Sequence, residues 1–379
     1  MRIAVVANTA WFLYNFCTST ITALIAAGHE PVILAPQDAY SERLTSLGVR
    51  CIDMPVDAAG THPLRELATL LRMHRLLRSL QLDAAFTYTP KVNIYVGLIA
   101  PRLGFAHVPN VSGLGRVFIE RNWLTPIVVT MYRLALRRAR RVVFLNDDDR
   151  RTFEQLGLVR PRQALQVPGA GINLAHFSPV ALPRDAFGAG PVFLYVGRLL
   201  GDKGLVELAE AVRQVRVLRP GAAFRLLGSA GVNNPSAISS QVLAMWRAEG
   251  LFELLGSTDD VRPFIAAADA VVLPSYREGI PRALLEAAAM GRPCIATDVP
   301  GCRDVVEHER TGLLCEARSA PSLQAALLRF VDSSPAQRAE WGRAARHKME
   351  QQFDERLVLE AYMKVTEDLA RDRASRAAG

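Results

Sequence analysis

The sequence predicts an α/β protein built from two doubly wound, parallel-sheet domains. Three observations predict it. Short β-branched apolar runs alternate with longer amphipathic segments, which is typical of right-handed strand–helix–strand units. The chain has 379 residues, more than one hydrophobic core usually serves. The alternation pauses over residues 169–190, which carry Pro179, Pro183 and several glycines without a clear period, and then restarts.

The first domain, residues 1–182, is predicted to hold seven buried strands. They are expected at residues 3–7, 31–35, 50–54, 83–86, 108–111, 141–145 and 164–167, where β-branched and apolar residues form short runs. Helix-period stretches lie between them, the longest at 64–80 and 123–140.

The second domain, residues 183–354, repeats the pattern with strands at 192–196, 224–227, 252–255, 270–273 and 294–296. A last helical segment, residues 355–379 with its clearest period at 355–373, is expected to pack back on the first domain. Open sheets of this class bind ligands beyond the carboxyl ends of their strands. With two such domains facing each other, the natural site is the cleft between them.

The positive charge is concentrated in one segment. The net charge is +8, and residues 101–141 alone contribute +7, with eight arginines against Glu120. A concentrated basic face indicates an anionic partner such as phospholipid, a pyrophosphate or nucleic acid. The five cysteines form no CxxC pair, which favours a reducing compartment and buried thiols. We expect no signal peptide and no spanning helix, and therefore a cytoplasmic protein that is soluble or lies on a membrane surface.

The most informative segment is 275–287, SYREGIPRALLEA, which follows an apolar strand ending at Pro274. Glu278 is expected in the loop at the strand's carboxyl end, and Pro281 at the first position of a helix that ends at Gly291. Backbone N–H groups at such a helix start can bind an anion. A diphosphate there would lie between Glu278, which can accept hydrogen bonds from sugar hydroxyls, and Glu286, which can accept them from a ribose.

The plainer interpretation makes Glu278 a solvated loop residue and Glu286 a helix-surface charge, and it is favoured for two isolated glutamates. The context argues against it. Glu286 lies among leucines and alanines on a helix that is too apolar to be a free surface. A charge on such a helix needs a partner or a ligand.

A second segment, 196–204, VGRLLGDKG, follows the first strand of the second domain, where phosphate-binding loops belong. It lacks the GxGxxG pattern, so nicotinamide and flavin dinucleotides are disfavoured. Arg198 and Lys203 supply two cations that could neutralise a departing diphosphate. An ordinary surface arginine and lysine is the alternative for this segment taken alone.

Together these segments resemble the retaining glycosyltransferases of the large family 4, which have the GT-B fold of two Rossmann-like domains. The resemblance continues through 291–306 and 311–314 and covers most of the second domain. It implies that Arg198, Lys203 and Glu278 form the catalytic group. It also implies a donor site made by Gly197, Arg198, Lys203, Thr258, Glu278, Gly279, Ile280 and Glu286.

The resemblance implies a nucleotide diphosphate sugar as donor, with uridine the expected base, and neither a cofactor nor a metal. In this family the acceptor is thought to attack the face from which the nucleotide leaves. Asp147, Asp148 and Asp149 are accordingly interpreted as acids at a helix start after Asn146, and no metal site is expected.

The first domain departs from much of the family. Residues 8–16 are aromatic where many members carry a glycine pair, and 110–115 stand where a histidine is expected, so His107 and His29 are interpreted as structural. Residues 88–95 and 112–115 resemble a subgroup that extends lipid-linked saccharides, adding hexose or N-acetylhexosamine to undecaprenyl diphosphate-linked sugars in bacterial glycan assembly. That resemblance places Asn15, Lys91, Asn93 and Ser112 at the acceptor. The alternative for Lys91 and Asn93 is a helix start without a ligand.

Residues Arg116–Arg141 mix arginines with large apolar side chains, which is typical of an interfacial helix on anionic lipid. A half-buried helix with a solvated face fits the pattern equally well. A lipid-linked acceptor favours docking on the inner face of the plasma membrane, and we hypothesise peripheral association there.

Two other functions are compatible with parts of the sequence. A nucleotide-sugar epimerase shares the architecture, but would need neither a basic face nor an acceptor; a phosphorylase would be far longer and need a pyridoxal-binding lysine. A non-catalytic anion- or nucleic-acid-binding protein is permitted by the isoelectric point near 9.5. The arginines, however, lie on an aliphatic helix without base-stacking aromatics, so we expect no nucleic-acid partner.

Overall fold

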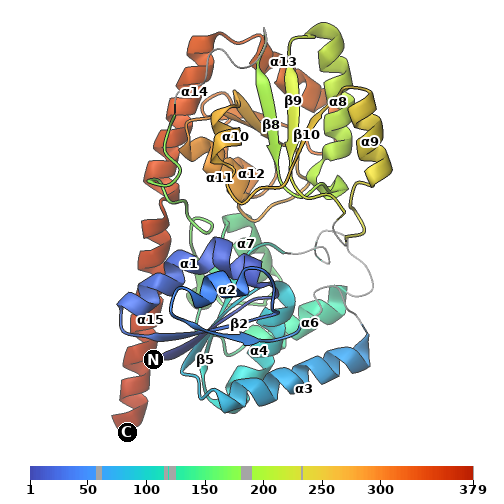
Figure 1. Ribbon diagram of the computed structural model, residues 1–379. Helices are drawn as coiled ribbons and strands as arrows, with labels where there is room; N and C mark the ends of the chain where they lie inside the picture. The colour runs from blue at the N-terminus through green and yellow to red at the C-terminus, as the bar shows by residue number, and fades with distance from the viewer. Residues whose placement is uncertain (57–61, 115–117, 119–124, 181–189, 232–233, 379) are drawn as a thin grey trace. The chain divides into compact units, whose positions relative to one another are not determined.

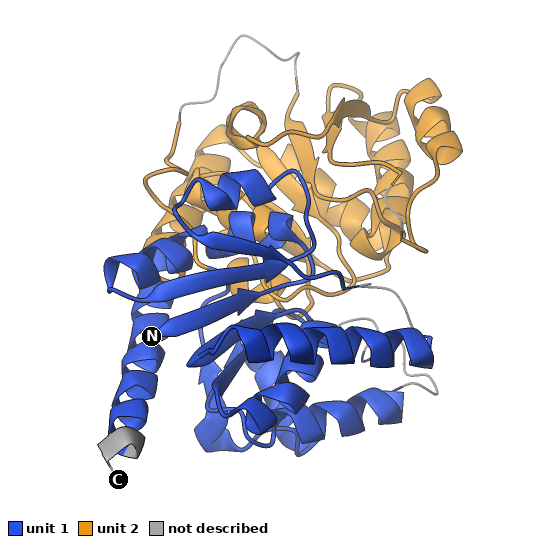
Figure 2. Ribbon diagram, turned by 60° about the horizontal axis from the view of Figure 1, so that its bottom comes forward, with its two compact units in different colours: residues 1–170, 355–379 blue, residues 171–354 orange. Residues whose placement is uncertain are grey.

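The structure, a computed structural model, describes residues 1–378 except 57–61, 115–117, 119–124, 181–189 and 232–233 (Figure 1). The chain divides into two compact units, coloured separately in Figure 2. Unit 1 comprises residues 1–170 and 355–379, and unit 2 comprises residues 171–354. The domain boundary expected after residue 182 lies outside the described residues, and the division falls between Ala170 and Gly171.

Unit 1 contains a seven-stranded sheet in the order β3-β2-β1-β4-β5-β6-β7, and every pairing between these strands is parallel. All seven predicted strands are present. They are β1 (Arg2–Val6), β2 (Glu30–Ala35), β3 (Arg50–Asp53), β4 (Ala84–Tyr88), β5 (Ala106–Val111), β6 (Val142–Phe144) and β7 (Ala164–Gln166).

Helices cover both faces of this sheet. The described helices are α1 (Ala10–Ala26), α2 (Ser41–Thr45), α3 (Pro63–Ser79), α4 (Pro90–Leu103), α6 (Thr125–Leu136), α7 (Asp147–Gln155), η1 (Pro161–Gln163) and α15 (Glu355–Ala378). Side chains of α3, α4 and α6 share one buried apolar cluster, and those of α1, α2 and α15 share the cluster on the other face. The last helix therefore belongs to unit 1 although it follows unit 2 along the chain.

Unit 2 contains a six-stranded parallel sheet in the order β10-β9-β8-β11-β12-β13. Its strands are β8 (Val192–Val196), β9 (Ala223–Leu227), β10 (Glu253–Gly256), β11 (Ala270–Leu273), β12 (Cys294–Thr297) and β13 (Gly312–Cys315). β13 was not among the predicted strands; it is a four-residue edge strand that starts at a glycine. Only glycine fits there, because a Cβ on Gly312 would lie 2.0 Å from the Cys294 carbonyl oxygen.

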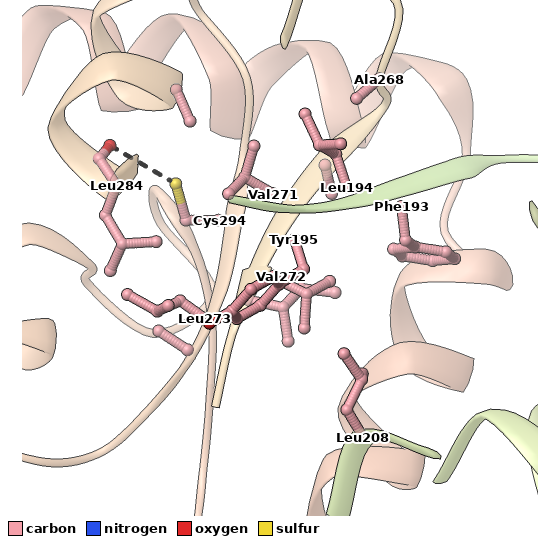
Figure 3. Packing of buried hydrophobic residues seen from close by; sticks show 14 of the residues in the cluster. Phe193, Leu194, Tyr195, Leu208, Ala268, Val271, Val272, Leu273, Leu284 and Cys294 are labelled. Carbon is pink, nitrogen blue, oxygen red and sulfur yellow. Dashed lines mark hydrogen bonds between the residues drawn. The ribbon is translucent and has the colours of Figure 1, made fainter. Parts of the chain in front are cut away.

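The described helices of unit 2 are η2 (Gly201–Lys203), α8 (Leu205–Leu218), α9 (Ser240–Ala248), α10 (Arg262–Ala266), α11 (Arg282–Ala289), α12 (Cys302–Val305), α13 (Ala320–Val331), α14 (Pro335–Lys348) and η3 (Met349–Phe353). Figure 3 shows the two central strands, β8 and β11, with Leu208 of α8 and Leu284 of α11 packed in the same cluster. Cys294 is buried there and its Sγ donates to the Leu284 carbonyl at 3.7 Å. Burial raises the pKa of this thiol to about 12, so it is an inert packing group.

A buried polar network joins α15 to the sheet of unit 1. The Thr87 hydroxyl donates to Asn93 Oδ1 at 2.7 Å and lies 2.9 Å from His107 Nε2, which must therefore be the donor of that pair. Asn93 donates to the Asn110 carbonyl at 2.8 Å, and the Tyr362 hydroxyl of α15 donates to Asn110 Oδ1. Burial lowers the pKa of His107 to about 3, so the imidazole stays neutral and has the structural role expected of it.

We expect Tyr362→Phe to destabilise the protein by about 1–3 kcal/mol, because it leaves Asn110 Oδ1 buried without that donor. Denaturant or thermal unfolding followed by circular dichroism measures the change. The matched control is Ser19→Ala, which removes an exposed hydrogen bond to Glu355 in the first turn of the same helix. Equal effects of the two substitutions would contradict the importance of the buried network.

Candidate functional site

The order of the strands in unit 2 points to a candidate site at the carboxyl ends of β8 and β11. The chain leaves β8 in one direction to reach β9 and β10, and β11 lies on the other side of β8. Ligands of doubly wound sheets bind at such a switch point, where neighbouring loops diverge. The two loops that follow these strands are residues 197–204 and 274–281, the two segments singled out in the sequence.

These two loops are packed directly against each other. Gly204 has φ +73°, and a Cβ there would lie 2.0 Å from the Pro274 carbonyl oxygen, so only glycine allows this approach. The Tyr276 N–H also donates to the Asp202 carbonyl at 3.1 Å. The loop after β8 is thereby held against the loop after β11, which sets the position of Lys203.

Lys203, Ser275 and Glu278 form the polar centre of the site. Lys203 Nζ lies 2.5 Å from Glu278 Oε1, and the Ser275 hydroxyl donates to the same oxygen at 2.6 Å. Ser275 is fully buried, and the Glu278 side chain is 13 % exposed. Within the described part of the chain Oε2 of Glu278 receives no hydrogen bond, so the carboxylate is fixed through one oxygen and offers the other as an acceptor.

The backbone of Glu278 and Gly279 rests against Gly301. The Glu278 N–H donates to the Pro300 carbonyl at 3.3 Å. Gly301 has φ +80°, and a Cβ there would lie 2.4 Å from the Gly279 carbonyl oxygen. The glycine is required both by its backbone conformation and by the space that it leaves. Ile280, the next predicted residue, is half-buried and packs on the core of unit 2.

Glu286 lies inside the helix that follows this loop. Its Oε1 accepts a hydrogen bond from Arg282 Nε at 2.6 Å, one turn earlier, and the residue is 7 % exposed. Burial raises the pKa of Glu286, Arg282 lowers it, and the charge of Asp260 raises it again. The carboxylate is thus buried and has a cationic partner, as a charge on so apolar a helix was predicted to need. It also lies near the loop after β10.

The helix itself starts one residue later than expected. α11 spans Arg282–Ala289, and Pro281 caps it in an extended conformation with ψ 117°. Pro281 was predicted to be the first helical residue. Proline fills that position well, and it is also tolerated at the capping position, because neither position needs a backbone N–H. Gly291, with φ +71°, follows the end of the helix as expected.

The remaining residues predicted to bind the donor lie at the same edge of the sheet. Gly197 follows β8 with φ +154°, and its carbonyl oxygen would lie 1.7 Å from a Cβ on Gly228. The Tyr195 hydroxyl fixes the Arg198 carbonyl at 2.7 Å, while the Arg198 guanidinium is exposed and has no partner among the described residues. Thr258 is exposed in the loop after β10, where its Oγ1 accepts from the Asp260 N–H at 3.1 Å.

The four residues predicted to bind the acceptor differ in their positions and contacts within unit 1. Asn15 lies in α1, in the second turn, and its amide donates to the Trp11 carbonyl at 2.9 Å. Lys91 lies at the start of α4, where its Nζ contacts Glu66 Oε1 of α3 at 3.0 Å. Ser112 directly follows β5 and is half-buried. The three follow strands β1, β4 and β5, respectively, along the chain.

Asn93 requires a correction. It is 1 % exposed and both ends of its amide are bonded within unit 1, to Thr87 and to Asn110. A side chain so buried and so fully hydrogen-bonded is a structural residue. The resemblance placed Asn93 at the acceptor, and a polar residue in the first turn of a helix does not by itself show which way it points.

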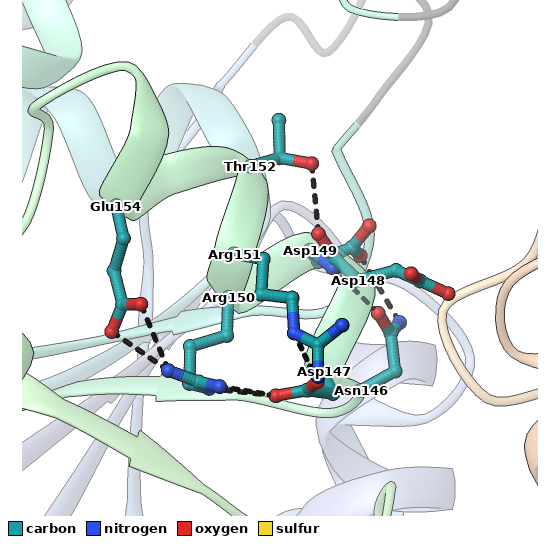
Figure 4. Close-up of polar contacts among 8 residues, drawn as sticks. All are labelled: Asn146, Asp147, Asp148, Asp149, Arg150, Arg151, Thr152 and Glu154. Carbon is teal, nitrogen blue, oxygen red and sulfur yellow. Dashed lines mark hydrogen bonds and ion pairs between the residues drawn. The ribbon is translucent and has the colours of Figure 1, made fainter.

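The three aspartates after β6 form a helix start. Asn146 caps α7 by accepting from the Asp149 N–H at 2.8 Å, and Asp147 pairs with Arg150 and with Arg151 (Figure 4). Acids in the first turn stabilise a helix through its dipole. Among the described residues no group of three or more His, Cys, Asp or Glu side chains could hold a metal ion. That the reaction needs no metal stays a prediction.

The arginines of the basic segment 101–141 differ in their contacts. Arg116 and Arg121 lie outside the described residues. Arg140 pairs with Asp372 of α15, and Arg141 donates to the Arg162 carbonyl at 2.6 Å, so neither guanidinium is simply free in solvent. Arg137 and Arg138 are exposed. Among the described helices none is both long and apolar enough to cross a membrane.

Comparisons with known proteins cover both units. The family described as glycosyl transferase 4-like domain matches residues 15–170, and the family described as glycosyl transferases group 1 matches residues 190–333.

Two curated relatives are similar to the chain over much of its length. An N,N'-diacetylbacillosaminyl-diphospho-undecaprenol α-1,3-N-acetylgalactosaminyltransferase of Campylobacter jejuni is 26 % identical, over 96 % of this chain and 98 % of its own. A UDP-Gal:α-D-GlcNAc-diphosphoundecaprenol α-1,3-galactosyltransferase of Escherichia coli is 28 % identical over 75 % of each chain.

Solved structures share the fold. Sucrose-phosphate synthase of Thermosynechococcus elongatus superimposes with a TM-score of 0.80 at 19 % identity, covering 98 % of this chain and 100 % of that one. Anabaena HepE in complex with UDP gives a TM-score of 0.77 at 17 % identity, covering 97 % of this chain and 100 % of that one.

Proposed function

The chain belongs to the glycosyltransferases with the GT-B fold, its first unit to the 4-like domain family and its second to group 1, and from this membership we propose its reaction. It transfers a hexose or N-acetylhexosamine from a nucleotide diphosphate sugar, with uridine as the base, to an undecaprenyl diphosphate-linked saccharide. Transfer retains the configuration at the anomeric carbon. The names of the Campylobacter and Escherichia relatives support the class of acceptor.

The observation that carries the proposal is the carboxylate of Glu278, fixed through Oε1 by Lys203 and Ser275 at the switch point of unit 2. We assign Oε2 to a hydroxyl of the donor sugar. A carboxylate that the protein already holds in place loses little conformational freedom when it accepts a hydrogen bond from the sugar. Because the protein holds one oxygen of the Glu278 carboxylate, the other oxygen is well placed to orient a sugar ring.

The diphosphate would bind beside this carboxylate, on the exposed Arg198 guanidinium and on Lys203. When the bond between the anomeric carbon and the phosphate oxygen breaks, negative charge develops on the leaving nucleoside diphosphate, and both cations stabilise it. The acceptor hydroxyl forms the new bond to the anomeric carbon on the same face of the ring, and its proton leaves with the diphosphate. Lys203 would then exchange part of its contact with Glu278 for the diphosphate.

The ribose of the nucleotide would bind Glu286, with Thr258 and its loop nearer the base. Glu286 is buried beside Arg282, and burial raises its pKa. Ribose hydroxyls donating to this carboxylate would favour its charged form. Lys91 and Ser112 are assigned to the acceptor in unit 1.

The test is thermal stabilisation by uridine, guanosine and adenosine diphosphates and their sugars. We expect UDP or a UDP-sugar at 100 times its Kd to stabilise the protein by about 2.7 kcal/mol, seen as a raised Tm, because it binds only the folded state. Glu286→Ala should shrink this shift. Glu340→Ala, which removes an exposed glutamate of α14, is the matched control and should leave the shift unchanged. A wild-type protein whose Tm no nucleotide raises at millimolar concentration would refute the donor site.

A further inference from the structure

An apolar stripe faces away from the protein along the first half of α3. Leu64, Leu67 and Leu71 are 73 %, 54 % and 49 % exposed. Their spacing of three and four residues places them on one side of the helix. Met73 and Leu77, on the opposite side, are buried in unit 1. The helix is thus apolar on both sides, which its packing on the sheet alone does not require.

The orientation of α3 is fixed by polar contacts with α4. Glu66 accepts hydrogen bonds from Lys91 Nζ at 3.0 Å and from the Tyr95 hydroxyl. By helical spacing Glu66 lies on the same side of α3 as the buried Met73 and Leu77, opposite the exposed leucines. Rotation of the helix that buried the leucines would break the hydrogen bonds of Glu66. The stripe is therefore held outward by the structure.

Helix α6 adds a second apolar stripe on the same layer. Ile127 and Leu134, seven residues apart, are 48 % and 57 % exposed. α3 and α6 share one buried cluster with α4, which lies between them on one face of the sheet (Figure 1). We call Leu64, Leu67, Leu71, Ile127 and Leu134 the leucine face.

Exposed cations surround the leucine face. Exposed arginines of α3 and of the turn after α6 lie beside it: Arg65, Arg72, Arg75, Arg78, Arg137 and Arg138. Within the described part of the chain none of these six forms an ion pair with an acid. Glu66, the one acid of α3, is turned inward to Lys91. Aliphatic side chains among arginines match the acyl boundary and headgroups of an anionic bilayer, whereas a nucleic-acid surface would present base-stacking aromatics.

We propose that the leucine face inserts into the headgroup boundary of an anionic bilayer, with the six arginines bound to lipid phosphates. This assigns the main apolar contact to α3, outside the basic segment 116–141 from which membrane association was predicted. The inference rests on the proposed function only in that a lipid-linked acceptor requires an enzyme at the bilayer. Binding to lipid itself can be measured without acceptor or donor.

The experiment is co-sedimentation of the full chain with vesicles of equal parts phosphatidylglycerol and phosphatidylcholine, and with phosphatidylcholine alone. We expect wild type to pellet with the anionic vesicles, less so in high salt. The double variant Leu67→Gln/Leu71→Gln should lower the partition coefficient at least fivefold with every arginine retained. The matched control is Val217→Gln/Leu218→Gln on α8, two apolar residues that are 79 % and 51 % exposed in unit 2. It should stay within twofold of wild type.

Three results would overturn the proposal: no pelleting of wild type, equal pelleting of the leucine variant, or an equal loss in the α8 control. Light scattering without vesicles tests whether the leucine face instead binds a second copy of the chain. A dimer that the leucine variant dissociates would assign the face to self-association instead. The nucleotide-induced rise in Tm should be the same in wild type and the leucine variant. A failed donor site would abolish that rise in both, and so is distinguishable from failed docking.

Discussion

Glu278→Gln should lower kcat/KM for glycosyl transfer by about 100-fold, which corresponds to about 2.7 kcal/mol of lost transition-state stabilisation. Glutamine has nearly the same size but no charge, so the sugar hydroxyl loses a charged acceptor, and hydrogen bonds to charged groups are worth about 1.5–3 kcal/mol. The variant also leaves Lys203 without its anionic partner. Initial rates with the nucleotide sugar that gives the largest thermal shift measure the effect.

Ser275→Ala separates charge from orientation. It removes the second donor to Glu278 Oε1 but leaves the ion pair with Lys203, so we expect a smaller loss, about tenfold. Ser275→Thr should recover part of the rate if the hydroxyl orients the carboxylate. Unchanged kcat/KM in Glu278→Gln would contradict the assignment of this carboxylate to the donor sugar.

Gly301→Ala should be among the most destabilising single substitutions in unit 2. The methyl group would lie 2.4 Å from the Gly279 carbonyl oxygen and 2.8 Å from that of Glu278, and φ is +80°. Backbone strain of this kind costs about 1–3 kcal/mol, and displacement of the neighbouring backbone adds to it. We therefore expect a loss of about 3 kcal/mol or more and, because Glu278 must move, a weaker nucleotide-induced thermal shift.

Gly231→Ala is the matched control. Its φ of +68° imposes similar backbone strain, but no atom lies within 4 Å of the added methyl group. Only the conformational cost, about 1–2 kcal/mol, should appear in differential scanning fluorimetry, and the nucleotide shift should stay. If the two substitutions behave alike, the contact between Gly301 and the donor loop does not stabilise the site.

The fold could be predicted from the sequence because buried parallel strands are continuous apolar runs, and twelve of them were recognised. The thirteenth, β13, begins at a glycine and is only four residues long, so it lacks such a run. No secondary structure was assigned to the aromatic segment 8–16. Thr9 caps α1 there by accepting from the Phe12 N–H at 3.1 Å, and the aromatic residues from Trp11 onward are helical.

The roles predicted for the site residues stay predictions, and the contacts among these residues could not be predicted from the sequence. That Glu278 and Lys203 belong to one site followed from their places after two strands, but their direct pairing depends on the close approach of Gly204 and Pro274. The burial of Asn93 and the outward turn of Leu64, Leu67 and Leu71 depend on which side of a helix meets the sheet. The sequence gives the period of a helix, but tertiary packing sets its rotation when both sides carry apolar residues.

The position of α15 has a consequence for how the protein is made. The core of unit 1 is completed by Val358, Tyr362, Val365 and Leu369, which follow all of unit 2 along the chain. During synthesis the first 170 residues must wait, with Phe86 and Asn110 lacking their final partners, while all of unit 2 emerges. Unit 2 has all of its strands by then and can fold first. A nascent chain that stalls before residue 355 therefore has all the strands of unit 2, whereas the core of unit 1 still lacks its last helix.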